Sequence, residues 1–95
     1  MNKWETGWQG FIDLCLHTKD AETLDAMFTL FLTPEEKVDI ARRFLIVKEL
    51  IHAEKTQRDI AKSLDVSIAK ITRGSNEIKR LSDKWVQYLQ EFYQR

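Results

Sequence analysis

Apolar residues recur along this chain at intervals of three and four positions, the spacing that gathers side chains on one face of an α-helix. The first such stretch predicts a helix from about Thr6 to Leu16, because Thr6 and Gln9 have capping-box spacing. Asp20 is the expected N-cap of a second helix. The apolar face of that helix carries Leu24, Met27, Phe28 and Phe31.

The clearest boundary in the pattern lies at Thr33 and Pro34. Thr33 is the expected N-cap, Pro34 suits the first helical position, and Glu36 completes a T-x-x-E box. The third helix is predicted to run to about Glu54. Its apolar positions form a broad surface: Val38, Ala41, Phe44, Leu45, Val47, Leu50 and Ile51. That breadth favours a central helix with neighbours on several sides.

Two shorter helices are predicted next. Thr56 and Asp59 resemble a second capping box, which opens a helix to about Leu64. Ser67 is the expected cap of a helix from Ile68 to about Arg80.

A last helix is predicted after Ser82, with an apolar face made of Trp85, Leu89, Phe92 and Tyr93. The chain has one proline and three glycines, too few for an architecture of strands and tight turns. We find no linker and no repeat. The fold class is therefore predicted to be all-α, with about six helices in a single domain over residues 1–95.

Residues 56–80 have the pattern of a helix-turn-helix motif. Its expected core positions are Ile60, Ala61, Leu64, Val66 and Ile71. Asp65 occupies the turn position where glycine is usual, and aspartate tolerates a positive φ better than most residues. Such a motif places its second helix in the DNA major groove.

The exposed positions of this motif carry groups that suit phosphates and base edges. The candidate DNA-binding residues are Gln57, Arg58, Lys62, Ser67, Ile68, Ala69, Lys70 and Thr72. Two capped helices with a short turn also occur in proteins that never bind DNA. The charge distribution favours DNA, because residues 55–80 contain seven basic and three acidic residues in a chain of zero net charge.

Other sequence features restrict the class of protein. Cys15 is the only cysteine, which fits a reducing compartment. We see neither a signal peptide nor an apolar run that could span a membrane, and expect a cytoplasmic protein without a membrane partner. One cysteine and two histidines make a poor metal site. No catalytic motif is present, so we expect no enzyme activity and no metal.

Several short runs make the chain resemble the tryptophan repressor family. They are L32-T33-P34-E35-E36, Arg43, Q57-R58-D59 and, above all, I71-T72-R73-G74-S75-N76. The resemblance covers roughly residues 30–89. It implies an intertwined homodimer that uses L-tryptophan as corepressor, with no other cofactor. It also implies a palindromic double-stranded operator at genes of tryptophan biosynthesis or transport.

The resemblance also implies a ligand site. The residues that match it are Leu30, Leu32, Thr33, Arg43, Arg73, Gly74 and Glu77. Arg43 and Arg73 would bracket the indole ring, and Arg73 would pair with the carboxylate. Leu30 and Leu32 would offer carbonyl oxygens to the ammonium group, and Thr33 would lie at the carboxylate.

Gly74 raises a question, because glycine inside a helix costs roughly 1 kcal/mol relative to alanine. We expect it to line the floor of the ligand slot, so that a β-carbon would project toward the ligand. Alanine would then hold or raise the stability of the ligand-free protein while weakening tryptophan binding.

The chain departs from the family pattern at several positions, and Lys62 and Ala61 redistribute the backbone-contacting charge of the first helix of the motif. Glu77 stands where the family has a serine, and Lys70 replaces a threonine on the reading helix. Three rival functions stay open: a repressor that responds to another amino acid or indole, a constitutive DNA-binding module, and a helical protein-interaction domain.

Overall fold

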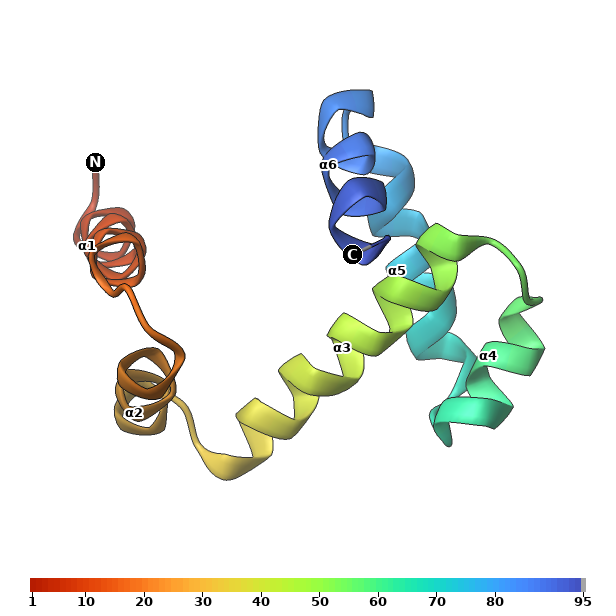
Figure 1. The fold of residues 1–95 in the computed structure, drawn as a ribbon, viewed down its shortest axis with the longest axis horizontal. Coiled ribbons are helices and arrows are strands. Elements are labelled where there is room, and N and C mark those ends of the chain that lie inside the picture. Colours follow the sequence, from red (N-terminus) through yellow and green to blue (C-terminus); the bar gives the residue numbers. More distant parts are fainter. Residues whose placement is uncertain (95) are drawn as a thin grey trace. The chain divides into compact units, whose positions relative to one another are not determined.

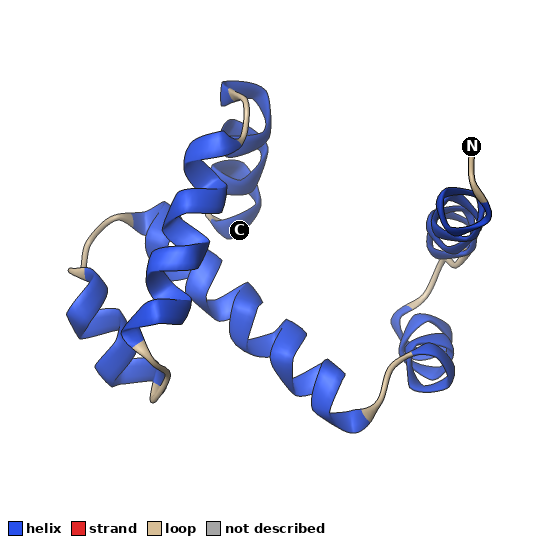
Figure 2. Ribbon diagram, turned by 180° about the vertical axis from the view of Figure 1, so that it is seen from behind, coloured by secondary structure: helices blue, strands red, loops and turns tan. Residues whose placement is uncertain are grey.

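The computed structural model describes residues 1–94, and every regular element among them is a helix (Figures 1 and 2). The helices are α1 (Lys3–His17), α2 (Ala21–Phe31), α3 (Pro34–His52), α4 (Gln57–Leu64), α5 (Ile68–Arg80) and α6 (Asp83–Tyr93). The predicted all-α fold of about six helices is confirmed.

Side-chain caps begin most helices at the residues that the sequence predicted. Thr33 and Glu36 form the reciprocal capping box at the start of α3. The Thr33 N–H donates to Glu36 Oε1 at 2.8 Å, and the Glu36 N–H donates to Thr33 Oγ1 at 3.1 Å. Three further side chains accept a hydrogen bond from a backbone N–H three residues later: Asp20, Thr56 and Ser67. The sequence therefore sets these helix starts locally.

Two helix ends differ from the prediction, and one predicted cap makes no side-chain hydrogen bond. Helix α1 begins at Lys3 instead of Thr6, because Asn2 Oδ1 accepts from the Glu5 N–H at 2.8 Å and supplies an earlier cap. Helix α3 ends at His52, before Ala53, whose positive φ of 57° stops the helix. Ser82 precedes α6 as expected, but its side chain makes no capping hydrogen bond.

The chain forms two compact units, Met1–Lys37 and Val38–Arg95. In the first unit, the ring of Phe11 lies at the centre of an aromatic cluster. Its centroid is 5.9 Å from that of Phe28, 5.6 Å from that of Phe31 and 5.8 Å from that of Trp8. Neither α1 nor α2 contains a fully buried residue. The organisation of residues 1–95 as a single domain stays a prediction.

The second unit contains the buried core. The buried side chains are Ile46 from α3, Ile60 and Ala61 from α4, and Ile71 from α5. Figure 1 shows α5 crossing the C-terminal half of α3, with α4 beside it. Helix α6 is tied to α3 by the Tyr93 hydroxyl, which donates to the Phe44 carbonyl oxygen at 3.1 Å.

The three tryptophans lie outside this core. Trp4 is 76% exposed, Trp8 61% and Trp85 49%. On α3, Val38, Phe44 and Leu45 are also nearly half exposed. The chain therefore leaves large apolar side chains of several helices exposed.

Candidate functional site

Helices α4 and α5 form the helix-turn-helix predicted over residues 56–80. Asp65 takes the left-handed conformation, with φ 54° and ψ 49°, and its N–H donates to the Lys62 carbonyl oxygen at 3.3 Å. The Val66 N–H donates to the Ala61 carbonyl oxygen at 3.0 Å. These bonds close the C-terminus of α4 and turn the chain into α5. The expectation that aspartate replaces glycine in this turn is confirmed.

The predicted core residues of the motif are buried or packed against its core. Ile60 and Ile71 have no exposed surface, and Ala61 is 8% exposed. The small side chain of Ala61 allows the two helices to approach closely. Leu64 and Val66 pack against this cluster.

The candidate DNA-binding side chains lie on the outside of the motif. Seven of the eight are exposed: Arg58, Lys62, Ser67, Ile68, Ala69, Lys70 and Thr72. Gln57 is half-buried, and its Oε1 accepts a hydrogen bond from the Thr72 hydroxyl at 3.0 Å. This bond links the start of α4 to the exposed side of α5.

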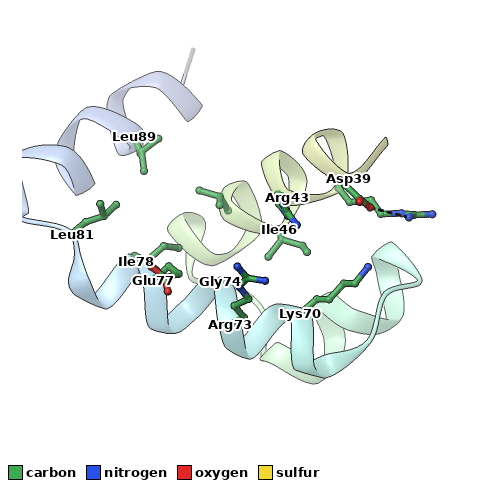
Figure 3. Close-up of a pocket in the computed structure, with 12 residues that line it drawn as sticks. Asp39, Arg43, Ile46, Lys70, Arg73, Gly74, Glu77, Ile78, Leu81 and Leu89 are labelled. Atoms are coloured by element: carbon green, nitrogen blue, oxygen red, sulfur yellow. Dashed lines mark ion pairs between the residues drawn. The ribbon is translucent and has the colours of Figure 1, made fainter. Parts of the chain in front are cut away.

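A pocket of about 390 Å³ lies between α3 and α5 (Figure 3). Its lining consists of Asp39, Arg42, Arg43, Ile46, Val47, Lys70, Arg73, Gly74, Glu77, Ile78, Leu81 and Leu89. Apolar side chains from three helices and from Leu81 supply most of this surface. The rim carries charges of both signs, with basic side chains in excess.

The basic side chains of this pocket are mostly unpaired. Among the described residues, the side chains of Arg43, Lys70 and Arg73 make no ion pair or hydrogen bond. The two acidic side chains of the pocket lining each pair with an arginine other than Arg43 and Arg73. Asp39 pairs with Arg42 at 3.8 Å, and Glu77 with Arg80 at 3.5 Å. The pocket therefore offers an apolar interior and unsatisfied positive charge, which together suit an apolar carboxylic acid.

The structure brings four of the predicted ligand residues together around this pocket: Arg43, Arg73, Gly74 and Glu77. Leu30, Leu32 and Thr33 belong to the first unit. There the Leu32 N–H closes α2 by donating to the Phe28 carbonyl oxygen at 2.8 Å, and the Thr33 hydroxyl caps α3. Their roles at a ligand stay predictions.

The expected orientation of Gly74 is wrong. A β-carbon on Gly74 would lie 3.2 Å from Ile46 Cγ2 and 3.3 Å from Leu50 Cδ1, so it points at α3. Gly74 does line the pocket, but its missing side chain permits the close approach of two helices. The direction of a β-carbon depends on how α5 crosses α3, which the local sequence does not specify.

Several lining residues did not follow from the sequence alone. Lys70 was assigned to DNA, although it lines the pocket. Ile46 and Val47 follow Arg43 by about one helical turn, so helical spacing could have suggested them. No spacing in the sequence connects Leu89 with Arg43 or Arg73, because Leu89 lies on a different helix, α6.

Among the described residues, no group of His, Cys, Asp and Glu side chains could hold a metal ion. In the same part of the chain, no helix has both the length and the apolar character needed to span a membrane.

The fold and the motif define the class of this protein as an all-helical protein with a helix-turn-helix motif. The chain belongs to the Trp repressor protein family, whose sequence model matches residues 6–93. This is a regulatory DNA-binding family and not an enzyme family.

Known relatives resemble the chain over most of its length. It is 43% identical over 90 residues to the Trp operon repressor homolog of Chlamydia trachomatis serovar D, covering 95% of this chain and 96% of that protein. The homolog of Chlamydia caviae is 46% identical over 85 residues, covering 90% and 84%. That of Vibrio vulnificus is 43% identical over 79 residues, covering 83% and 78%.

Proposed function

We propose that this repressor uses L-tryptophan as its corepressor, bound in the pocket between α3 and α5. The observation that carries the proposal is the placement of unpaired cations around an apolar pocket whose wall is the reading helix itself. A ligand there touches both the long helix α3 and the helix that enters the DNA groove. Ligand binding can therefore favour one orientation of α5.

The proposed binding mode uses the chemistry of the two arginines. The planar guanidinium groups of Arg43 and Arg73 stack on the two faces of the indole ring, and Arg73 binds the carboxylate. Glu77 attracts the charge of the ammonium group, while Leu30, Leu32 and Thr33 keep the ligand roles that the resemblance implies. These roles come from the family resemblance.

DNA binding is proposed to use both helices of the motif. Residues Ser67, Ile68, Ala69 and Thr72 meet base edges in the major groove, while Gln57, Arg58 and Lys62 bind the backbone. In dimeric helix-turn-helix proteins, Trp repressors among them, the two reading helices meet successive major grooves ~34–36 Å apart. A palindromic operator follows from that two-fold symmetry.

The corepressor mechanism predicts reciprocal coupling. If tryptophan favours the DNA-binding state, operator DNA must tighten tryptophan binding by the same factor. A suitable duplex can be selected from random DNA with protein and tryptophan present. Calorimetry then measures tryptophan affinity with and without that duplex, for the wild type and for Arg73→Ala. Equal tryptophan affinities of the wild type in both titrations would exclude the mechanism.

A homodimer is part of the proposal. The exposed apolar side chains include Trp8, Phe31, Phe44, Leu45 and Trp85, and a second copy of the chain would cover such a surface. Sedimentation at micromolar concentration should give twice the chain mass of 11.3 kDa. A monomer under those conditions would remove both the palindrome and the groove-spacing argument. The role implies a cytoplasmic location.

A second candidate is a repressor of this family that answers another amino acid or indole. Glu77 supports this alternative, because an acidic side chain in the pocket lining affects which cationic groups of a ligand are attracted. Calorimetry with a panel of aromatic and aliphatic amino acids distinguishes the two.

Two simpler functions predict different results. A constitutive DNA-binding module would show no ligand effect in a gel shift. A protein-interaction domain would bind its partner without the steep loss of affinity at high salt that DNA binding shows.

A further inference from the structure

We infer that Lys70 is a third cation of the ligand pocket and binds the carboxylate of the ligand. Lys70 is the third residue of α5 and lines the pocket together with Arg73 and, across from them, Arg43 of α3. Figure 3 shows the side chains of Lys70 and Arg73 extending from α5 toward α3. The inference rests on the proposed function in one respect, namely that the ligand is an apolar carboxylic acid.

Helical geometry separates Lys70 from two of the DNA-reading positions, Ile68 and Thr72. Residues advance by about 100° around an α-helix. The pocket-lining positions of α5 are 70, 73, 74, 77 and 78, which lie within an arc of about 140° that includes Lys70. Ile68 and Thr72 are about 160–200° away from Lys70, on the opposite side of the helix. Accordingly, the Thr72 hydroxyl donates a hydrogen bond to Gln57 Oε1 of α4 at 3.0 Å. Lys70 therefore faces the ligand side of α5.

The charges of the pocket leave Lys70 available for an anion. Its ammonium group has no ion pair or hydrogen bond among the described residues. The nearby carboxylates of Asp39 and Glu77 are paired with Arg42 and Arg80. Three unpaired cations around one apolar pocket repel one another, and an anionic ligand relieves that repulsion. Lysine suits this position because its apolar stem can follow the pocket wall while the ammonium group moves to the anion.

The test measures ligand binding without DNA, by calorimetry. The proteins are the wild type, Lys70→Met and Lys70→Arg, and the ligands are L-tryptophan, indole-3-propionate and tryptamine. We expect Lys70→Met to weaken the binding of L-tryptophan and of indole-3-propionate, the two ligands with a carboxylate, by about three- to tenfold. This is the range of a partly exposed charge-assisted contact. Lys70→Arg keeps the cation and should retain affinity. Any binding of tryptamine, which has no carboxylate, should not weaken in Lys70→Met.

The matched control is Lys79→Met, which removes an exposed lysine of α5 that does not line the pocket. It should bind tryptophan as the wild type does, and circular dichroism should show equal helix content in all variants. The difference between wild type and Lys70→Met should shrink as salt rises, because mobile ions screen the contact.

The outcomes separate the inference from the proposed function. If Lys70→Met binds tryptophan with wild-type affinity and only its DNA binding is weaker, the inference is overturned. Lys70 then belongs to the DNA interface. A wild type that binds tryptophan without any effect of DNA would overturn the corepressor mechanism and leave the Lys70 result standing. A wild type that binds neither carboxylate would overturn both.

Discussion

Gly74 of α5 lies directly against Ile46 of α3, and a β-carbon on Gly74 would be only 3.2 Å from Ile46 Cγ2. Ile46 is 3% exposed, so it cannot turn outward into solvent at no cost. It also lines the pocket, so displacing the Ile46 side chain would change the shape of the pocket. The absence of a side chain at Gly74 therefore bears on both the spacing of the two helices and the pocket between them.

This relationship predicts that Gly74→Ala lowers both stability and tryptophan affinity. Overpacking a core contact costs about 1–3 kcal/mol, whereas alanine gains about 1 kcal/mol of helix propensity. We expect a net loss of up to about 2 kcal/mol in the free energy of unfolding, measured in urea at fixed protomer concentration. Gly10→Ala is the control, since a β-carbon there would meet nothing within 4 Å beyond its chain neighbours and the nearby backbone of its own helix, and it should stabilise. A Gly74→Ala protein that is more stable than the wild type would show that α3 accommodates the β-carbon without strain.

The left-handed backbone of Asp65 predicts the effects of changing the turn. A left-handed conformation costs an ordinary residue roughly 1–2 kcal/mol, and a β-branched residue tolerates it worst. We expect Asp65→Val to destabilise by about that amount. Asp65→Gly should stay within about 1 kcal/mol of the wild type. Glycine adopts the left-handed turn without strain, but it loses more conformational entropy when the chain folds. Thermal unfolding compares the three proteins, and equal values for the glycine and valine variants would contradict the argument.

The hydrogen bond from Thr72 to Gln57 predicts coupling between the two helices of the motif. The carbonyl oxygen of the Gln57 amide is occupied, which directs its NH₂ group toward other acceptors. Gln57→Ala and Thr72→Val should therefore be non-additive in stability, by about 0.5–1 kcal/mol in a double-mutant cycle. Thr72→Ser keeps the hydroxyl and serves as the control. Strict additivity would show that the bond contributes nothing in solution.

Tyr93 predicts a dependence of stability on alkaline pH. Burial raises the pKa of the Tyr93 hydroxyl, so its pKa in the folded chain exceeds the unfolded value of about 10. Its contribution is fully present below that unfolded pKa and is lost as pH rises through the folded pKa. Tyr93→Phe removes the bond to the Phe44 carbonyl oxygen and should cost about 0.5–1.5 kcal/mol at neutral pH.

The same variant should lose less stability than the wild type when the pH is raised above about 10. Denaturant titrations at a series of pH values measure this difference. Tyr88→Phe, at a position 62% exposed, should follow the wild type. If Tyr93→Phe and the wild type lose stability in parallel, Tyr93 is not the titrating group.

The sequence by itself determined the features that depend on near neighbours along the chain. The box of Thr33 and Glu36 and the turn at Asp65 involve residues a few positions apart, so composition and spacing sufficed. Buried Ile60 and Ile71 followed from helical periodicity in the same way. The predicted start of α1 was late because Asn2, and not Thr6, supplies the cap.

Only the tertiary structure decided which faces of those helices meet. The side of α5 that carries Lys70 faces α3, and Leu89 of α6 reaches the same pocket from a distant part of the chain. The direction of the missing Gly74 side chain, toward Ile46, follows from the crossing of α3 and α5. Helical spacing specifies which residues share a face, whereas the neighbour that covers the face is chosen by packing between elements remote in sequence.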